Sequence, residues 1–357
     1  MNNWQNIDKP FPYDPNDVDI RQQQFSVDQL LRMIERNRIE LWREEYYQRT
    51  SNSWNRGQKS RLIESIIMRI PLPMLYFDGS EEPWKIIDGL NRLSTLYSFI
   101  HEENWALQQL EFMSEFENYR FTELPYKYQR AILESTLVAY VINPGTPDRV
   151  KLNIFQRINT GGKSLTPQEI RNAYYSGIAK DFIDRLSVSS EFLAATKDKI
   201  SRNGMRDKEV ILRFVAFYKF IEEYQTPMTD FLDTVMDRIS TFPDLDDIEV
   251  QFKKSMKLCV EIFGDSAFYL LDDMGERKSF KINVALFETL TVNFAKLSDV
   301  EAEVILKERK KVFRSFTKLF QNKEFHQSIS SSTSSKKAIF TRFHSVENVL
   351  NILLHGK

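Results

Sequence analysis

The sequence predicts an α+β fold: a mixed α/β N-terminal domain followed by an all-helical C-terminal domain. Strand-like and helix-like patterns alternate between residues 38 and 142, and strand-like patterns stop after residue 148. Beyond residue 205, apolar residues recur with the 3.6-residue period of helices. A chain of 357 residues is also longer than one compact core usually accommodates, so we expect two domains.

The N-terminal part begins with a polar, proline-rich stretch, and we expect residues 1–25 to form an extended arm. Ser26 and Gln29 have the spacing of a capping box, which predicts that a helix begins there. Runs of β-branched and aromatic residues bounded by turn residues predict the strands. The expected strands are 39–42, 74–77, 84–87 and 137–142, and the expected helices between them are 62–67 and 93–100.

The C-terminal part carries several apolar stripes at helical spacing, which indicate packing between helices rather than a cofactor site. Thr166, Pro167 and Glu169 predict a helix start, with a capping box and a proline at the first helical position. Residues 328–335 are rich in Ser and Thr and predict a flexible loop. The charged run 307–311 is interpreted as a solvated helix face.

Composition excludes several classes of protein. With 49 basic and 50 acidic residues the net charge is −1, so contact with DNA would need a local basic patch. The single cysteine, Cys259, excludes an internal disulfide and a cysteine-rich zinc site, and the four His residues show no metal-ligand spacing. No apolar run is long enough to span a membrane, so we expect a cytoplasmic protein without membrane contacts.

One apparent phosphate-binding loop is rejected. Gly162, Lys163 and Ser164 resemble the end of a Walker A motif. That motif needs a glycine five residues before Gly162, preceded by a strand. Arg157 occupies the position, and a helical pattern precedes it.

The segment from Asp88 to Arg92 is a stronger candidate for a phosphate site. A strand precedes it, Gly89 occupies the turn, and a helix follows, so backbone N–H groups and the positive end of the helix dipole face the turn. Arg92 could hold an anion with two hydrogen bonds, and Asp88 could hold a divalent cation or a sugar hydroxyl. An ordinary strand–helix turn with Asp88 as the N-cap is the alternative.

Two further polar segments are candidates for the same site. Gln48 and Arg49 follow the first expected strand, and a surface salt bridge is the alternative explanation. Arg157 to Gly162 ends one helix and leads to the helix that starts at Thr166. Here the alternative is a glycine C-cap with Asn159 as a turn residue.

In four ordered segments the chain resembles domain-of-unknown-function family 262, the N-terminal module of GmrSD-type modification-dependent restriction systems. The segments are YYQRTSNSW, SRLIESIIMRIPLPMLYF, IIDGLNRLSTL and FQRINTGGKSLTPQEIRNA, within residues 25–180. This family is a relative of the ParB and sulfiredoxin fold. The resemblance therefore implies a ParB/sulfiredoxin-like domain over 26–180, and RDKEVILRF and EIFGDSAF resemble the helical continuation of many members, here 181–357.

The resemblance implies nucleotide binding, and in some members hydrolysis, at a DGQQR motif. Here the motif reads Asp88, Gly89, Leu90, Asn91, Arg92. Leu90 can neither donate nor accept a hydrogen bond, so we expect phosphate binding to be kept better than catalysis. Related systems also carry an HNH-type nuclease, which needs a His in a metal-bound β-hairpin. The dispersed His residues and the helical C-terminal part argue against nuclease activity in this chain.

The leading hypothesis is a nucleotide-binding module of a prokaryotic anti-phage or restriction-type defence system. It would bind a nucleoside triphosphate with Mg²⁺, and its helical domain would control a partner effector or form a homo-oligomer. One alternative is an active NTPase that acts on its own, and another is a DNA-binding protein without nucleotide chemistry. The catalytic candidates are Asp88, also the metal ligand, and Arg92; the nucleotide-binding candidates are Gln48, Arg49, Gly89, Asn91, Arg157, Asn159, Gly161 and Gly162.

Overall fold

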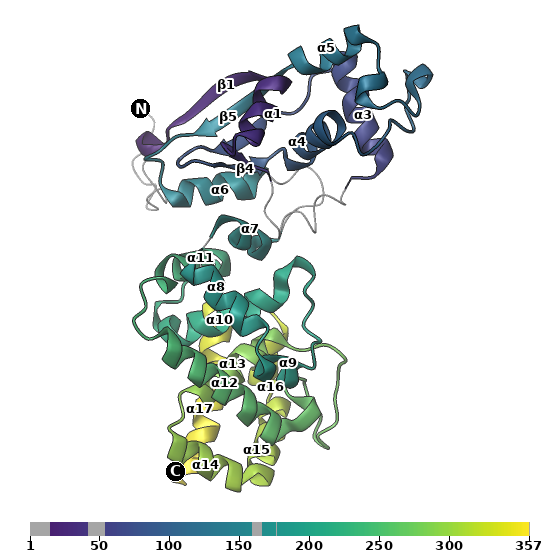
Figure 1. Ribbon diagram of the computed structural model, residues 1–357. Coiled ribbons are helices and arrows are strands. Elements are labelled where there is room, and N and C mark those ends of the chain that lie inside the picture. Colours follow the sequence, from purple (N-terminus) through teal and green to yellow (C-terminus); the bar gives the residue numbers. More distant parts are fainter. Residues whose placement is uncertain (1–14, 42–53, 159–165, 176, 357) are drawn as a thin grey trace, which may run out of the picture. The chain divides into compact units, whose positions relative to one another are not determined.

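In the computed structural model the chain divides into two compact units, Met1–Ser164 and Leu165–Lys357. The structure describes residues 15–41, 54–158, 166–175 and 177–356. The first unit contains a mixed sheet with helices, and the second is helical (Figure 1). This confirms the predicted α+β fold followed by a helical domain.

The first unit is built on a five-stranded sheet with the strand order β1-β5-β3-β4-β2. β5 pairs antiparallel with β1 and parallel with β3, while β4 pairs antiparallel with β3 and parallel with β2. The strand bounds are Ile20–Ser26 for β1, Ile39–Glu40 for β2, Leu75–Asp78 for β3, Trp84–Asp88 for β4 and Thr136–Ile142 for β5.

Four of these strands lie where the sequence predicts them, and β1 does not. The sequence predicts an extended arm for residues 1–25, but residues 20–26 form an edge strand along β5. The reason is that the three central residues of β1 are glutamines, which hide the alternation of apolar and polar residues that marks a strand. The capping box of Ser26 is confirmed, since its hydroxyl accepts a hydrogen bond from the Gln29 amide at 3.1 Å.

One face of this sheet is covered by the core of the first unit. Leu75 and Phe77 of β3 and Ala139 and Val141 of β5 are buried there, in one cluster with apolar residues of the surrounding helices. These helices are α1 (Val27–Glu35), α3 (Arg56–Ile67), α4 (Leu90–Tyr97), which continues into a π-helical turn, and α5 (Tyr126–Glu134), which the sequence analysis did not predict.

The opposite face carries the alternate residues of the same strands, including Asp78 of β3. Helix α6 (Asp148–Ile158) lies against this face. The contact is shown by its buried Lys151, whose ammonium Nζ is 3.8 Å from the Asp78 carboxylate Oδ2. The two faces of the sheet are therefore covered by different helices. The candidate turn at Asp88 lies at the end of β4.

The second unit consists of helices around one apolar cluster. Between α12 and α13 the described residues contain a single isolated β-bridge, Leu271 to Arg277, and no strand. The helices are α7 (Pro167–Tyr174), α8 (Ile178–Ser187), α9 (Ser190–Thr196), α10 (Arg206–Phe220), α11 (Met228–Ile239), α12 (Leu245–Phe263), α13 (Val284–Ala295), α14 (Asp299–Lys307), α15 (Arg309–Gln321), α16 (Lys323–Ser330) and α17 (Lys336–His355).

Helix α7 belongs to the second unit, whereas the sequence predicts a domain boundary at residue 180. Its start is as predicted, with a capping box between Thr166 and Glu169 and a proline at the first position. Arg171 is buried and binds α11, donating hydrogen bonds to the Asp233 carboxylate at 2.6 Å and the Thr229 carbonyl at 3.0 Å. These tertiary contacts explain why the compact unit begins before the boundary that the sequence pattern suggests.

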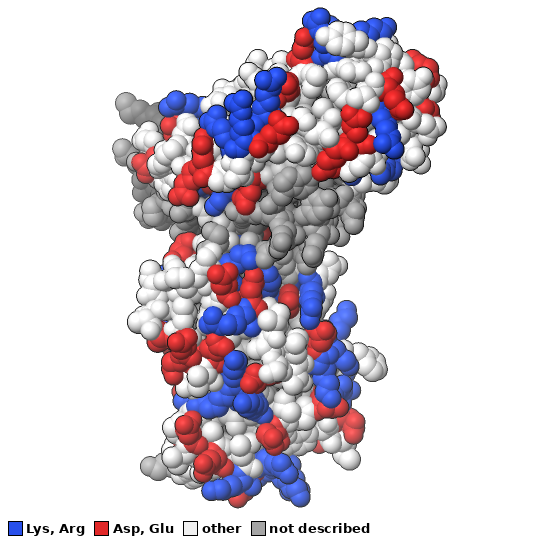
Figure 2. Space-filling view, in the orientation of Figure 1, with Lys and Arg blue, Asp and Glu red and all other residues white. Residues whose placement is uncertain are grey.

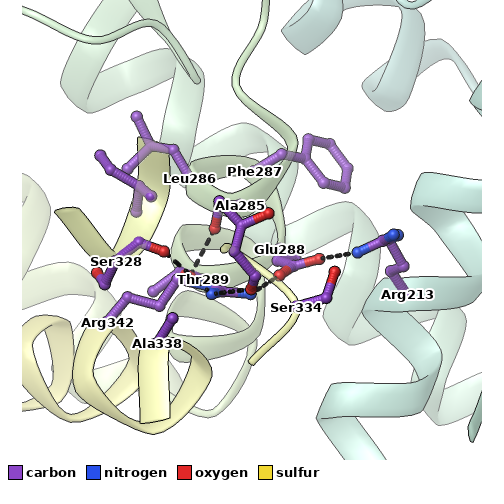
Figure 3. Close-up of polar contacts among 12 residues, drawn as sticks. Arg213, Ala285, Leu286, Phe287, Glu288, Thr289, Ser328, Ser334, Ala338 and Arg342 are labelled. Carbon is purple, nitrogen blue, oxygen red and sulfur yellow. Dashed lines mark hydrogen bonds and ion pairs between the residues drawn. The ribbon is translucent and has the colours of Figure 1, made fainter. Parts of the chain in front are cut away.

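A buried ionic network joins α10, α13 and α17 (Figure 3). The carboxylate of Glu288 accepts hydrogen bonds from Arg342 and, at 3.3 Å, from Arg213; Glu288 and Arg342 are both fully buried. Burial lowers the pKa of Arg213, but the carboxylates of Glu288 and Glu209 outweigh this effect and the pKa is raised. Two arginines and two glutamates thus balance each other's charge inside the helical unit.

The same network orders the Ser/Thr-rich segment that composition predicts to be flexible. Arg342 donates hydrogen bonds to the carbonyls of Thr333 at 2.7 Å and Ser328 at 3.3 Å. Ser328 lies in α16, and Ser335 is the N-cap of α17. Hence the backbone of this segment serves as the hydrogen-bond partner of a buried arginine.

Among the described residues, no helix combines the length and the apolar character that crossing a membrane requires.

Candidate functional site

The candidate site is the turn between β4 and α4. Gly89 is the N-cap of α4 and has a φ of 109°, a conformation that L side chains rarely adopt. A Cβ atom on Gly89 would also collide with the side chain of Leu75. The alternative of Asp88 as N-cap is not observed, and no side chain caps α4 among the described residues. A helix N-terminus without a side-chain cap is a common binding place for anions.

Arg92 ties this turn to the segment that precedes β3. Its guanidinium donates hydrogen bonds to the carbonyls of Pro73 and, at 3.0 Å, Met74, and to Oδ2 of Asp88 at 2.7 Å. The side chain is only 10% exposed. Burial lowers the pKa of Arg92, and the Asp88 carboxylate opposes this shift. Three of the five N–H donors of an arginine are therefore engaged within the protein.

Asp88 keeps part of its carboxylate accessible. The side chain is 36% exposed, and its Oδ2 is the atom that accepts the bond from Arg92. Within the part of the chain that the structure describes, Oδ1 accepts no hydrogen bond. The carboxylate is therefore oriented by Arg92 and has one oxygen available for a cation or a hydroxyl group.

Two tyrosines accompany Asp88 on the same face of the sheet. Tyr76 is in register with Asp88 on one side and with Tyr140 on the other. The two tyrosine rings stack, with centroids 5.4 Å apart and an interplanar angle of 25°. Burial, the neighbouring Tyr140 and Asp88 raise the pKa of Tyr76. Sequence reasoning missed this pair, although the period-two alternation of the predicted strands places both residues opposite the core face.

The structure brings together Asp88, Gly89, Asn91 and Arg92. In Asn91 the backbone carbonyl accepts hydrogen bonds from two hydroxyls of α4. Leu90, the apolar residue of the motif, packs against the core of the first unit. Arg157 lies exposed in the last turn of α6. The remaining candidates lie outside the described residues: Gln48, Arg49, Asn159, Gly161 and Gly162.

Protein ligands for a metal are few. The described residues contain no group of three or more His, Cys, Asp or Glu that could hold a metal ion. Mg²⁺ is usually bound by one or two carboxylates together with substrate phosphates and water. Asp88, with one available oxygen beside an uncapped helix end, fits this mode of binding and does not fit an all-protein cage.

Residues 27–176 match the family model described as the GmrSD restriction endonuclease, N-terminal domain. The match covers β3, β4, β5 and the turn at Asp88, and it confirms the resemblance that the four sequence segments indicate. It indicates a component of a restriction-type system. No curated protein and no solved structure matches the chain.

Proposed function

We propose that the N-terminal unit binds a nucleoside triphosphate at the turn from Asp88 to Arg92, as the nucleotide-responsive module of a restriction-type anti-phage defence system. The observation that carries this proposal is the uncapped N-terminus of α4, which follows a positive-φ glycine. The half-exposed carboxylate of Asp88 lies beside it. The family match supports the restriction context.

Each residue of the turn has a distinct role in this proposal. The first amides of α4 bind phosphate oxygens, and Asp88 binds the accompanying Mg²⁺. Arg92 positions Asp88 and the turn, and its remaining N–H donors strengthen the positive potential. Gln48, Arg49 and the segment 157–162 complete the site, and the helical unit controls a partner effector or a homo-oligomer.

Nucleotide binding is expected to raise the melting temperature of the N-terminal unit. A ligand at 100 times its Kd stabilises a protein by about 2.7 kcal/mol, or about 5–10 °C for a domain of this size. Thermal unfolding with a panel of ribonucleotides and deoxyribonucleotides, with and without Mg²⁺, measures this shift. Tryptophan fluorescence suits the measurement because all five Trp residues lie within residues 4–105. If no nucleotide changes the transition, the proposal fails.

Substitution of Arg92 is expected to weaken nucleotide binding far more than substitution of Lys163. Arg92→Ala removes a charge-assisted donor and releases Asp88, for a loss of about 1.5–3 kcal/mol, or about ten- to a hundredfold in affinity. Lys163 only resembles a Walker lysine in sequence, so we expect Lys163→Ala to change the affinity by no more than about 0–1 kcal/mol. Calorimetric titration of Arg92→Ala and Lys163→Ala with the same nucleotide compares them.

Arg92→Lys is the control for charge, because a lysine keeps the positive charge but cannot bridge three acceptors at once. It therefore separates the loss of charge from the loss of the contacts that hold the turn. Equal losses for the Arg92 and Lys163 variants, with folding intact, would move the site to the segment around Gly161 and Gly162.

Hydrolysis is a second candidate activity, favoured by the available oxygen of Asp88. In that case Asp88 would place the metal, and Arg92 would stabilise transferred charge. Release of inorganic phosphate by the purified chain separates an NTPase from a nucleotide-binding module.

A further inference from the structure

Helix α15 presents charge of one sign to solvent. Residues 309–323 contain six basic residues and no acidic residue. Lys310, Arg314 and Lys318 follow one another at a spacing of four residues, and Lys311 lies beside them, so all four project from one side of the helix. All four are exposed, and together they are called the basic stripe.

The opposite side of α15 anchors the helix in the core. Val312, Phe316 and Phe320 are fully or almost fully buried there. Because this side is already occupied, α15 has no apolar face to insert into a lipid bilayer, unlike an interfacial amphipathic helix. The basic stripe is therefore held on a rigid support and turned to solvent.

The basic stripe has no carboxylate partners among the described residues. Its neighbours do: Arg309 pairs with Glu261 at 3.6 Å, and Lys307 pairs with Glu303 at 3.8 Å. By contrast, no ion pair joins a member of the stripe to any residue in the described ranges. Like charges four residues apart mildly destabilise a helix, so this arrangement favours an external anion.

A loop extends the surface at the C-terminal end of α15. The ammonium of Lys278 donates a hydrogen bond to the Gln321 side chain at 2.8 Å, and the Gln321 amide donates to the Leu271 carbonyl at 2.9 Å. Lys281 of the same loop is exposed. Figure 2 shows Lys and Arg side chains gathered at the end of the helical unit where α14 and α15 lie.

We propose that the basic stripe is a docking surface for the phosphate backbone of duplex DNA. From Lys310 to Lys318 the helix rises about 12 Å, a length over which one strand of a duplex presents three or four phosphates. Three cations at regular spacing, with a fourth beside them on the same helix, match this repeating charge. The near-neutral net charge of −1 does not argue against this contact, because the positive charge is local. The proposal goes beyond nucleotide binding and does not depend on it.

The test is a titration of the full chain, without nucleotide, into a fluorescein-labelled duplex of about 30 base pairs at about 50–200 mM NaCl. The logarithm of the binding constant is expected to fall with the logarithm of salt concentration with a slope of about −3 to −4. The variant Lys310→Ala/Lys311→Ala/Arg314→Ala/Lys318→Ala is expected to bind at least about tenfold more weakly, with a slope closer to zero by about 3.

A matched variant controls for the loss of positive charge as such. Lys197→Ala/Arg238→Ala/Lys253→Ala/Lys257→Ala removes the same number of lysines and arginines from the same unit, and each of these residues is paired with a carboxylate. Its DNA affinity is expected to change by less than about threefold, with both variants folded by circular dichroism. Equal losses in the two variants, or no binding by the parent chain, would overturn the proposal. Competition by polyglutamate as strong as that by unlabelled DNA would also overturn it, in favour of an acidic protein partner.

Discussion

Glu288→Ala is expected to lower the free energy of unfolding of the helical unit by about 3–5 kcal/mol, because it leaves the fully buried Arg342 without its carboxylate. The guanidinium Nε of Arg342 already has no hydrogen-bond partner, so the network has no spare acceptor to replace the lost one. Chemical denaturation followed by far-UV circular dichroism measures the change. The transition reported by tryptophan fluorescence, which comes from the first unit, serves as the reference.

Glu209→Ala is the matched control. Glu209 also binds Arg213, through Oε1 at 2.9 Å, but its side chain is 29% exposed, so water replaces the carboxylate at a cost of about 0–1 kcal/mol. Glu288→Gln keeps the shape and an acceptor, and we expect a loss between the two. If Glu288→Ala and Glu209→Ala had the same small effect, Glu288 would not hold the network together.

Gly89→Ala is expected to lower the free energy of unfolding of the N-terminal unit by about 2–5 kcal/mol. The methyl group adds strain at a positive φ, about 1–2 kcal/mol, and collides with the side chain of Leu75, for about 1–3 kcal/mol more. Because the turn must shift to relieve both, nucleotide affinity should fall as well. Denaturation followed by tryptophan fluorescence gives the stability, and calorimetric titration gives the affinity.

Gly145→Ala separates the two contributions. Gly145 has a φ of 94°, but a Cβ atom there would meet nothing within 4 Å. The substitution should therefore lower the free energy of unfolding only by the backbone strain, about 1–2 kcal/mol. The nucleotide affinity should stay unchanged. Equal costs at the two glycines would mean that the contact between Gly89 and Leu75 does not constrain the turn.

Local signals predicted most of the fold. The capping boxes at Ser26 and Thr166 each satisfy backbone amides within four residues, so they could be recognised without tertiary information. β1 could not be recognised in this way, since its glutamines pair with a strand more than a hundred residues away. The strand gains its stability from that pairing. The position of Arg171 is a similar case, because a buried ion pair with Asp233 leaves no periodic trace in the sequence.

The candidate site was predicted in part. The order of strand, glycine and helix placed Asp88, Gly89 and Arg92 correctly relative to one another. The sequence did not indicate that Arg92 is buried, because its acceptors are the carbonyls of Pro73 and Met74 in another segment. Whether an arginine binds a ligand or groups of its own protein depends on such non-local contacts. The spacing of residues in the sequence does not predict them.

The pairing of β1 with β5 also determines when the N-terminal unit can form during synthesis. Ile20 is in register with Ile142 and Ser26 with Thr136, so β1 must wait for residues 27–135 to be translated. At about 5–20 residues per second this delay is roughly 5–25 s. Since β5 also lies between β1 and β3, both strands keep unpaired edges until β5 leaves the ribosome. A nascent chain that stalls before β5 is therefore a target for chaperones, and a recombinant N-terminal fragment has to extend beyond Ile142.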